Sequence, residues 1–144
     1  MKMTLIKDIQ LLSLPKIHTE SGNITAINNG TEVNFDIRRC YYLYDIPGGA
    51  ARGGHAHKNL HQLIVAASGS FEVRIDDSYE RQTILLNQPD QGLYLPPGLW
   101  RELDNFSAGS ICLVLASEKY SETDYIRDYH EYRNYKKQES ASLT

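Results

Sequence analysis

Apolar and polar residues alternate one by one along much of the chain. In the segment SFEVRIDD, Phe71, Val73 and Ile75 fall on one side of an extended chain, and charged residues fall on the other side. This period of two is typical of an antiparallel strand with one buried face. The apolar run at 61–67 precedes it, and Gly69 between the two runs permits a tight turn. We therefore predict a hairpin here.

Further strand-like runs lie before and after this hairpin, and Gly, Pro, Asn and Asp separate them at short intervals. These runs cover residues 23–29, 33–46, 81–87, 92–97, 99–106 and 110–117. Many short strands at such spacing indicate a sandwich or a barrel, and closure of a barrel removes exposed strand edges. We expect an all-β fold.

The C-terminal part breaks this pattern. Residues 121–137 contain Ser121 and Asp124 as candidate helix caps, and they predict one or two short helices on the surface. The small and polar residues 138–144 are predicted to be disordered. The 144 residues show no repeat or linker, so we expect a single domain over residues 1–137.

Composition and charge exclude several classes of protein. The net charge is −3, and no basic block marks a nucleic-acid surface. Lys7, Asp8 and Gln10 interrupt the N-terminal apolar residues, so we expect no signal peptide, and no apolar run approaches a membrane span. Cys40 and Cys112 lie in apolar runs and are expected to be small buried thiols without a disulfide. A cytoplasmic protein is expected.

The segment RGGHAHKNLHQ concentrates the candidate chemistry. It holds His55, His57 and His61, three of the five histidines of the chain. An imidazole titrates near pH ~6.5, so such a cluster suits metal ligation or proton transfer, and a solvated strand surface is the alternative. The other two histidines, His18 and His130, are expected to be structural or exposed.

The strand pattern and the His-x-His pair resemble the cupin jelly roll. The first cupin motif has a glycine region, His-x-His and then a Glu; Gly53, His55 and His57 match, and His61 stands where the Glu is expected. The resemblance implies a cupin jelly-roll barrel with a short helical C-terminal tail.

The second cupin motif differs at its metal ligand. Its glycines, proline and asparagine are matched, but Arg101 stands at the histidine position. A guanidinium has no acceptor lone pair and repels a cation, so Arg101 cannot ligate a metal. The three histidines at 55, 57 and 61 could still supply three nitrogen ligands, which leaves a metal-dependent cupin oxygenase open as an alternative.

Five segments in order resemble one branch of the cupins, the dTDP-4-keto-6-deoxyglucose 3,4-ketoisomerases. They lie between residues 19 and 135 and read TESGNITAIN, RRCYYLYDIP, RGGHAHK, GLYLPPGLWRELDNFS and LVLASEKYSETDYIRDY. The resemblance implies a cofactor-free and metal-free homodimer with exchanged N-terminal strands. Its substrate would be a dTDP-linked 4-keto-6-deoxyhexose, whose ketone moves from C4 to C3 on the way to a 3-amino-3,6-dideoxyhexose of surface polysaccharide.

The same resemblance assigns catalytic roles. His55 is the candidate base at C3 and His57 the partner that relays or returns a proton, although the two roles could be exchanged. Residues i and i+2 of a strand point to one face, so both histidines face the cavity if either does. Tyr41 matches a position near the sugar, where it would polarise an oxygen or donate a proton; a wall aromatic is the alternative.

Four basic residues are candidates for substrate binding. Arg101 would stabilise an enediolate or bind the diphosphate. Arg39 and Arg52 are candidates for the diphosphate with Lys58 behind them, and a solvated surface charge is the alternative for each. Arg101 resembles the family members that give the gluco product, dTDP-3-keto-6-deoxyglucose, whereas Ser21 fits neither product type.

His61 keeps another alternative open. Because it replaces the usual Glu, the resemblance does not say whether a carboxylate orients the catalytic pair, and His61 could instead pack beside His57. A noncatalytic sugar-nucleotide-binding cupin therefore also remains open.

Overall fold

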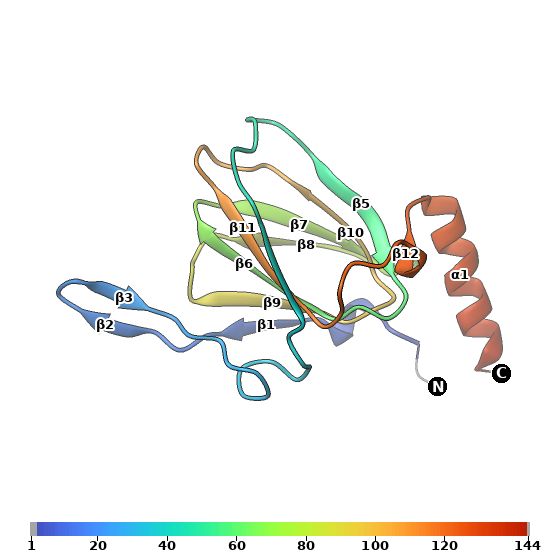
Figure 1. Cartoon of the computed structure of the whole chain (residues 1–144). Helices are drawn as coiled ribbons and strands as arrows, with labels where there is room; N and C mark the ends of the chain where they lie inside the picture. The colour runs from blue at the N-terminus through green and yellow to red at the C-terminus, as the bar shows by residue number, and fades with distance from the viewer. Residues whose placement is uncertain (1–2, 144) are drawn as a thin grey trace.

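Two antiparallel sheets face each other in the computed structural model, which describes residues 3–143 (Figure 1). The first sheet contains, in spatial order, β1 (Gln10–Ser13), β9 (Gln91–Leu95), β6 (Gln62–Ser68), β11 (Ile111–Ala116) and β4 (Arg39–Leu43). The second contains β12 (Tyr125–Ile126), β5 (Arg52–His57), β10 (Trp100–Asp104), β7 (Phe71–Asp76) and β8 (Arg81–Leu86). The predicted all-β jelly-roll barrel is confirmed.

The remaining elements lie at two ends of the barrel. The strands β2 (Ile17–Thr19) and β3 (Gly22–Ile24) form a hairpin that projects away from it, and the helix α1 (Tyr129–Ser142) lies on the opposite side (Figure 1). Two short 3-10 helices, η1 (Ile6–Asp8) and η2 (Glu122–Asp124), precede β1 and β12. Within residues 3–143, no helix is long and apolar enough to cross a membrane.

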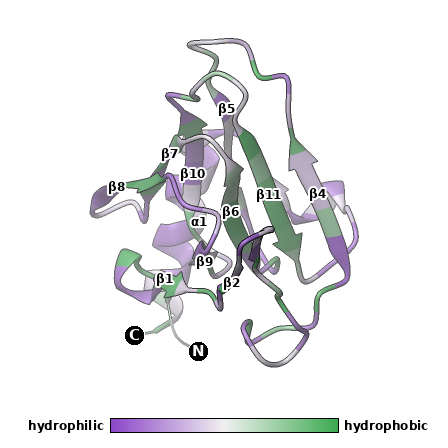
Figure 2. Ribbon diagram, turned by 90° about the vertical axis from the view of Figure 1, so that its left-hand side faces the viewer, coloured by the Kyte–Doolittle hydropathy of each residue, from purple (hydrophilic) through white to green (hydrophobic). Residues whose placement is uncertain are grey.

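Alternation along the strands builds the core between the sheets. Phe71, Val73 and Ile75 are almost completely buried there, as their spacing predicts. Hydrophobic residues are concentrated in β6 and β11, in the middle of the first sheet (Figure 2). Each of these central strands buries both faces, because a second apolar cluster covers the outer side of the first sheet.

The predicted hairpin is wrong, because β6 and β7 belong to different sheets and do not pair with each other. The outer cluster explains where other strand predictions were wrong. Residues 33–38 form no strand, and the predicted strand at 23–29 is reduced to the end of β3. Val33, Phe35 and Ile37 do alternate as predicted, but they pack on the outer face of the first sheet. A segment with alternating apolar residues can thus bury its apolar side against a sheet without forming the hydrogen bonds of a strand.

Helix α1 begins later than the sequence suggested and ends later. Its N-cap is Asp128, whose side chain accepts a hydrogen bond from the Glu131 backbone N–H at 2.9 Å. The helix continues to Ser142, so residues 138–142 are helical and not disordered. The Ser142 hydroxyl donates to the carbonyl of Glu139 and satisfies one of the free carbonyls of the last turn. The final predicted tail residue, 144, lies outside the described residues.

Two fully buried side chains attach α1 to the turn that precedes β10. The Tyr132 hydroxyl donates to the Gly98 carbonyl at 2.9 Å, and the Lys136 ammonium donates to the same carbonyl at 3.1 Å and to that of Thr4 at 2.6 Å. Gly98 in turn donates its N–H to the carbonyl of His57 at 2.7 Å. The helix therefore holds the end of the strand that carries the histidine pair.

The two cysteines are free thiols, as predicted, but they differ in exposure. Cys112 is buried. Cys40 is exposed, which the sequence analysis did not predict, because it lies on the outward face of β4 at the edge of its sheet.

Replacing Lys136 tests the anchoring of the helix. We expect Lys136→Met to lower the free energy of unfolding by about 1.5–3 kcal/mol, because a charged donor to two buried carbonyls is lost. Urea denaturation measures this change. The control Lys137→Met removes an exposed charge from the same helix and should change stability by less than about 0.5 kcal/mol. Equal effects of the two variants would contradict the anchoring role.

Candidate active site

A cavity of about 360 Å³ opens between the two sheets. Strands β4, β5, β6, β10, β11 and β12 contribute to its wall. The polar part of the wall consists of His55, two tyrosines and four arginines, and the rest is apolar apart from Gly53. The cavity therefore lies between the sheets at the predicted catalytic residues His55 and Tyr41, where a ligand could reach them.

A bulge in β5 aims the residues of that strand. Arg101 pairs with His55 and Leu103 pairs with Arg52, so β5 uses one more residue than β10 over this stretch. Gly53 lies within the bulge with φ of 94°, a conformation that favours glycine. The extra residue lets both Arg52 and His55 face the cavity.

The two histidines of the His-x-His pair lie in contact. Their Nε2 atoms are 3.2 Å apart, and the Arg101 Nε donates to the His55 Nε2 at 3.0 Å. His57 lies behind His55 and is 3% exposed. The ring of Tyr125 packs against both, with centroid distances of 4.4 Å to His57 and 5.0 Å to His55. The structure thus brings together three predicted site residues and one that was missed.

A carboxylate from the C-terminal part of the chain completes the pair. The Asp124 Oδ2 lies 2.9 Å from the His57 Nδ1, and the Oδ1 accepts a hydrogen bond from the Asn59 backbone N–H at 2.7 Å. From the sequence, Asp124 was only a candidate helix cap. Its place in the segment SETDYIRDY, which carried part of the family resemblance, was the available signal.

The environment keeps both imidazoles neutral. Burial and then the Arg101 charge lower the pKa of His55 from its usual value to about 3. Burial, Arg101 and the neighbouring His55 lower the pKa of His57 as well. The contact with Asp124 opposes this shift, because a carboxylate stabilises an imidazolium. Neutral imidazoles have a free lone pair and can therefore act as bases.

Tyr41 faces the cavity, whereas its neighbours do not. Its hydroxyl accepts a hydrogen bond from the Gln62 side chain at 3.1 Å, and burial raises its pKa while the Arg101 charge acts in the opposite direction. Tyr42 and Tyr44 point outward and are 58% and 61% exposed. Tyr41 is thus positioned to offer its hydroxyl to a bound molecule.

The cavity wall carries positive charge without a lining carboxylate. Arg39 lies 4.6 Å from the centre of the Tyr41 ring, and Arg52 is the exposed first residue of β5. Arg127, which the sequence analysis missed, lies 4.0 Å from the centre of the Tyr125 ring. Lys58 is exposed and does not line the cavity. Of the predicted diphosphate ligands, the structure therefore gathers the arginines and leaves the lysine outside.

His61 lies on the outer side of the first sheet. Its Nδ1 is 2.7 Å from the Tyr94 hydroxyl, and its ring stacks on Phe35 at 5.9 Å, so it does not pack beside His57. Within residues 3–143, no three His, Cys, Asp or Glu side chains are grouped so that they could hold a metal. The ligand set of the three-histidine alternative is therefore not formed. As expected, His18 and His130 are exposed.

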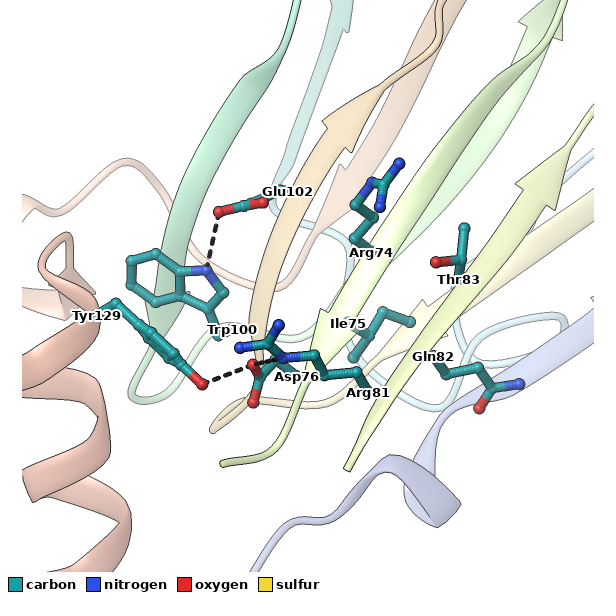
Figure 3. A pocket seen from close by; sticks show the side chains of 9 residues that line it. All are labelled: Arg74, Ile75, Asp76, Arg81, Gln82, Thr83, Trp100, Glu102 and Tyr129. Atoms are coloured by element: carbon teal, nitrogen blue, oxygen red, sulfur yellow. Dashed lines mark hydrogen bonds and ion pairs between the residues drawn. The ribbon is translucent and has the colours of Figure 1, made fainter. Parts of the chain in front are cut away.

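A smaller pocket of about 230 Å³ lies on the opposite face of β10 (Figure 3). Trp100 stacks on Tyr129 there, and Asp76 accepts hydrogen bonds from Tyr129 at 2.6 Å and from Arg81 at 2.9 Å. Successive residues of a strand point to opposite faces, so this pocket is separated from Arg101 by the sheet. It contains no histidine, and the Asp76 carboxylate is already bonded.

The lowered histidine pKa values predict a dependence of stability on pH. Between about pH 6.5 and 5, the unfolded chain protonates His55 and His57 while the folded chain does not, so the free energy of unfolding should fall as pH falls. The slope is at most about 1.4 kcal/mol per pH unit for each histidine. Urea denaturation at several pH values measures it. His55→Asn should reduce the slope and His130→Asn should not; an unchanged slope in the first variant would contradict the assignment.

The chain matches a known protein family over most of its length. Residues 7–137 match a family model described as FdtA: WxcM-like, C-terminal. A TDP-4-oxo-6-deoxy-alpha-D-glucose-3,4-oxoisomerase from Aneurinibacillus thermoaerophilus is 40% identical over 126 residues, which cover 88% of this chain and 91% of that protein.

Two solved structures extend this similarity to the whole barrel. QdtA from Thermoanaerobacterium thermosaccharolyticum, a sugar 3,4-ketoisomerase in complex with TDP, has a TM-score of 0.91 and 38% identity over 94% of this chain and 98% of its own. WlaRB from Campylobacter jejuni, a TDP-quinovose 3,4-ketoisomerase, has a TM-score of 0.86 and 43% identity over 90% of this chain and 99% of its own. With a paired His-x-His strand inside a barrel of this topology and a family match over nearly its full length, the chain belongs to the FdtA-like family of sugar-nucleotide 3,4-ketoisomerases.

Proposed function

We propose that the protein is a cofactor-free isomerase that moves the ketone of dTDP-4-keto-6-deoxyglucose from C4 to C3. The observation that carries this proposal is a neutral histidine pair in close contact, next to a cavity whose charged wall residues are all arginines. Such a wall suits an anionic sugar nucleotide, and neutral imidazoles suit proton transfer next to a ketone. The names of its relatives support the same substrate class.

The reaction is an internal redistribution of protons and electrons. His55 takes the proton from C3, the C3–C4 double bond forms, and the electron pair of the carbonyl bond moves to the C4 oxygen. The pair then returns a proton to C4 while the C3 hydroxyl loses its proton and becomes the ketone, with the C4 oxygen protonated. No electrons leave the sugar, so the protein's task is to hold and move protons.

Arg101 and Tyr41 stabilise the enediolate in this proposal. Arg101 lies beside the His55 lone pair, and it would turn its hydrogen bond to the substrate oxygen as negative charge develops there. This movement frees the His55 Nε2 to accept the C3 proton. The Tyr41 hydroxyl supplies a second donor on the facing sheet.

The diphosphate is assigned to the three cavity arginines that are not buried. Arg39, Arg52 and Arg127 line the same cavity as the histidine pair and can form charge-assisted hydrogen bonds with phosphate oxygens. Arg101 is buried and adjacent to His55, so we assign it to the sugar and not to the diphosphate.

We further propose the gluco product, dTDP-3-keto-6-deoxyglucose, as a precursor of a 3-amino-3,6-dideoxyhexose. Support comes from Arg101 at its position and from 43% identity to a relative named as a TDP-quinovose 3,4-ketoisomerase. The next reaction on such a product would be transfer of an amino group to the C3 ketone.

Proton NMR of the nucleotide sugar tests the function. Chelator-treated protein incubated with dTDP-4-keto-6-deoxyglucose should produce a 3-keto sugar, because no metal takes part in the proposed steps. In D₂O the new C4 hydrogen should be replaced by deuterium where the pair exchanges with solvent, and the H4 couplings in H₂O identify the epimer. His55→Asn should lower turnover by about 10²–10⁴-fold, the usual contribution of a general base, with nearly unchanged TDP affinity.

The matched control is His130→Asn, which changes an exposed histidine of α1 and should keep wild-type turnover. Tight TDP binding without product would favour the noncatalytic binding module instead. A His55→Asn variant with substantial turnover would remove His55 from the role of base.

We also propose that two copies form a dimer through the hairpin of β2 and β3. Ile17 and Ile24 lie opposite each other in its register and are 58% and 59% exposed. An isolated two-stranded hairpin is only marginally stable in water, so its apolar residues favour contact with a second chain. The outward-facing Tyr42 on the edge strand β4 and Tyr44, just after this strand, offer a complementary apolar surface.

Charged residues in the hairpin test the dimer. The double variant Ile17→Lys and Ile24→Lys should convert a dimer to a monomer, because two buried apolar contacts per hairpin are replaced by charges. Light scattering after size-exclusion chromatography measures the mass. The control Glu20→Lys adds charge at the exposed turn and should remain dimeric; a monomeric wild-type protein would contradict the proposal.

A further inference from the structure

A continuous line of close polar contacts runs from the C-terminal segment to β10. It connects the Asp124 carboxylate to the His57 Nδ1, the two Nε2 atoms of the histidines to each other, and the His55 Nε2 to the Arg101 Nε. The contacts measure 2.9, 3.2 and 3.0 Å in this order. Arg101 at one end can only donate hydrogen bonds, and the Asp124 carboxylate at the other end can only accept them. The ring protons of the two histidines between them can therefore be assigned.

Arg101 fixes the proton of His55. A guanidinium has donors only, so the His55 Nε2 that receives its N–H must carry the lone pair. The proton of the neutral ring is therefore on Nδ1.

Asp124 fixes the proton of His57 in the same way. An ionised carboxylate only accepts hydrogen bonds, so the His57 Nδ1 bears the proton and its Nε2 carries the lone pair. Asp124 is itself held in place, because its Oδ1 accepts from the Asn59 N–H at 2.7 Å and its backbone carbonyl accepts from the Lys58 N–H at 3.0 Å. The two Nε2 lone pairs thus face each other with no proton between them.

We propose that Asp124 is a positioning residue that holds His57 in the Nδ1–H tautomer and thereby makes the histidine pair an acceptor for one proton. It does not line the cavity and acts through His57. The catalytic part of this inference rests on the proposed ketoisomerase function, whereas the tautomer is a property of the protein alone.

The proton balance gives the carboxylate its role. When the C3–H bond breaks, its electron pair forms the C3–C4 double bond and the proton binds to the His55 Nε2, where the His57 Nε2 at 3.2 Å shares it. The pair then carries one positive charge, and the negative charge of Asp124 stabilises it at the buried end. The pair loses this charge again when a proton is returned to C4.

Asp124→Asn separates this role from simple packing. The amide oxygen can keep the bond to the Asn59 N–H, which leaves the NH₂ group facing the His57 Nδ1. Because NH₂ donates only, the His57 proton should move to Nε2 and point at the His55 lone pair. In the variant, the proton on the His57 Nε2 would then occupy the space between the two rings, where the proton from the substrate has to be shared.

The first readout is the pair of ring nitrogen chemical shifts of His57 in ¹⁵N NMR, which distinguish a protonated nitrogen from one with a lone pair. We expect Nδ1 to be protonated in the wild type and Nε2 in Asp124→Asn. A wild-type His57 protonated at Nε2, or a tautomer unchanged by the substitution, would overturn the inference, and neither measurement needs substrate or activity.

The second readout is kinetic. Asp124→Asn should lower kcat by about 10²–10⁴-fold with KM close to the wild-type value, because proton uptake and not binding is affected. Asp124→Glu, which restores the carboxylate, should recover the Nδ1–H tautomer and part of kcat. The control Asp128→Asn removes a carboxylate four residues away, keeps a good helix cap, and should leave kcat unchanged.

The outcomes distinguish the two proposals. A wild-type protein without ketoisomerase activity would overturn the proposed function, while the nitrogen shifts would still decide the role of Asp124. An active wild type with an equally active Asp124→Asn variant would overturn the positioning role alone. If Asp124→Asn does not fold, the wild-type tautomer and Asp124→Glu still provide the test.

Discussion

Backbone hydrogen bonds between β5 and β10 place His55 directly opposite Arg101, and the chemistry of the site depends on this register. A shift of β5 by one residue would turn His55 to the outer face, where Ala56 now packs in the cluster under the helix. The bulge at Gly53 adjusts the ladder so that Arg52 still reaches the cavity. The helix reinforces the other end, since the carbonyl of Gly98 receives Tyr132 and Lys136 while its N–H holds His57.

Charge in the cavity follows from the same arrangement. Burial, and then the permanently charged arginines that line the cavity, make protonation of a nearby imidazole unfavourable, so the histidines are kept as neutral bases. With a metal-ligating side chain in place of Arg101, the guanidinium charge would be absent, and a cation could bind near the histidine lone pairs.

Much of this architecture follows from local patterns in the sequence. Alternation identified the core strands, and the spacing of His55 and His57 required a common face. Local patterns could not identify β12, because two residues are too few to show a period. Its pairing with β5 at His57 joins residues that are far apart in the chain. Asp124, Tyr125 and Arg127 were missed for this reason. The outward position of His61 was equally hidden, since it depends on the Tyr94 hydroxyl of a distant strand.

The short strand β12 determines how heat inactivates the protein. Asp124 and His57 are separated by 67 positions in the chain, and β12 joins the sheet through only two paired residues. Opening this segment would leave the barrel and its spectroscopic signals intact while the histidine pair lost its carboxylate. Enzyme activity would therefore disappear before the fold does, and loss of activity on heating would measure local opening at the C-terminal segment and not unfolding of the whole chain.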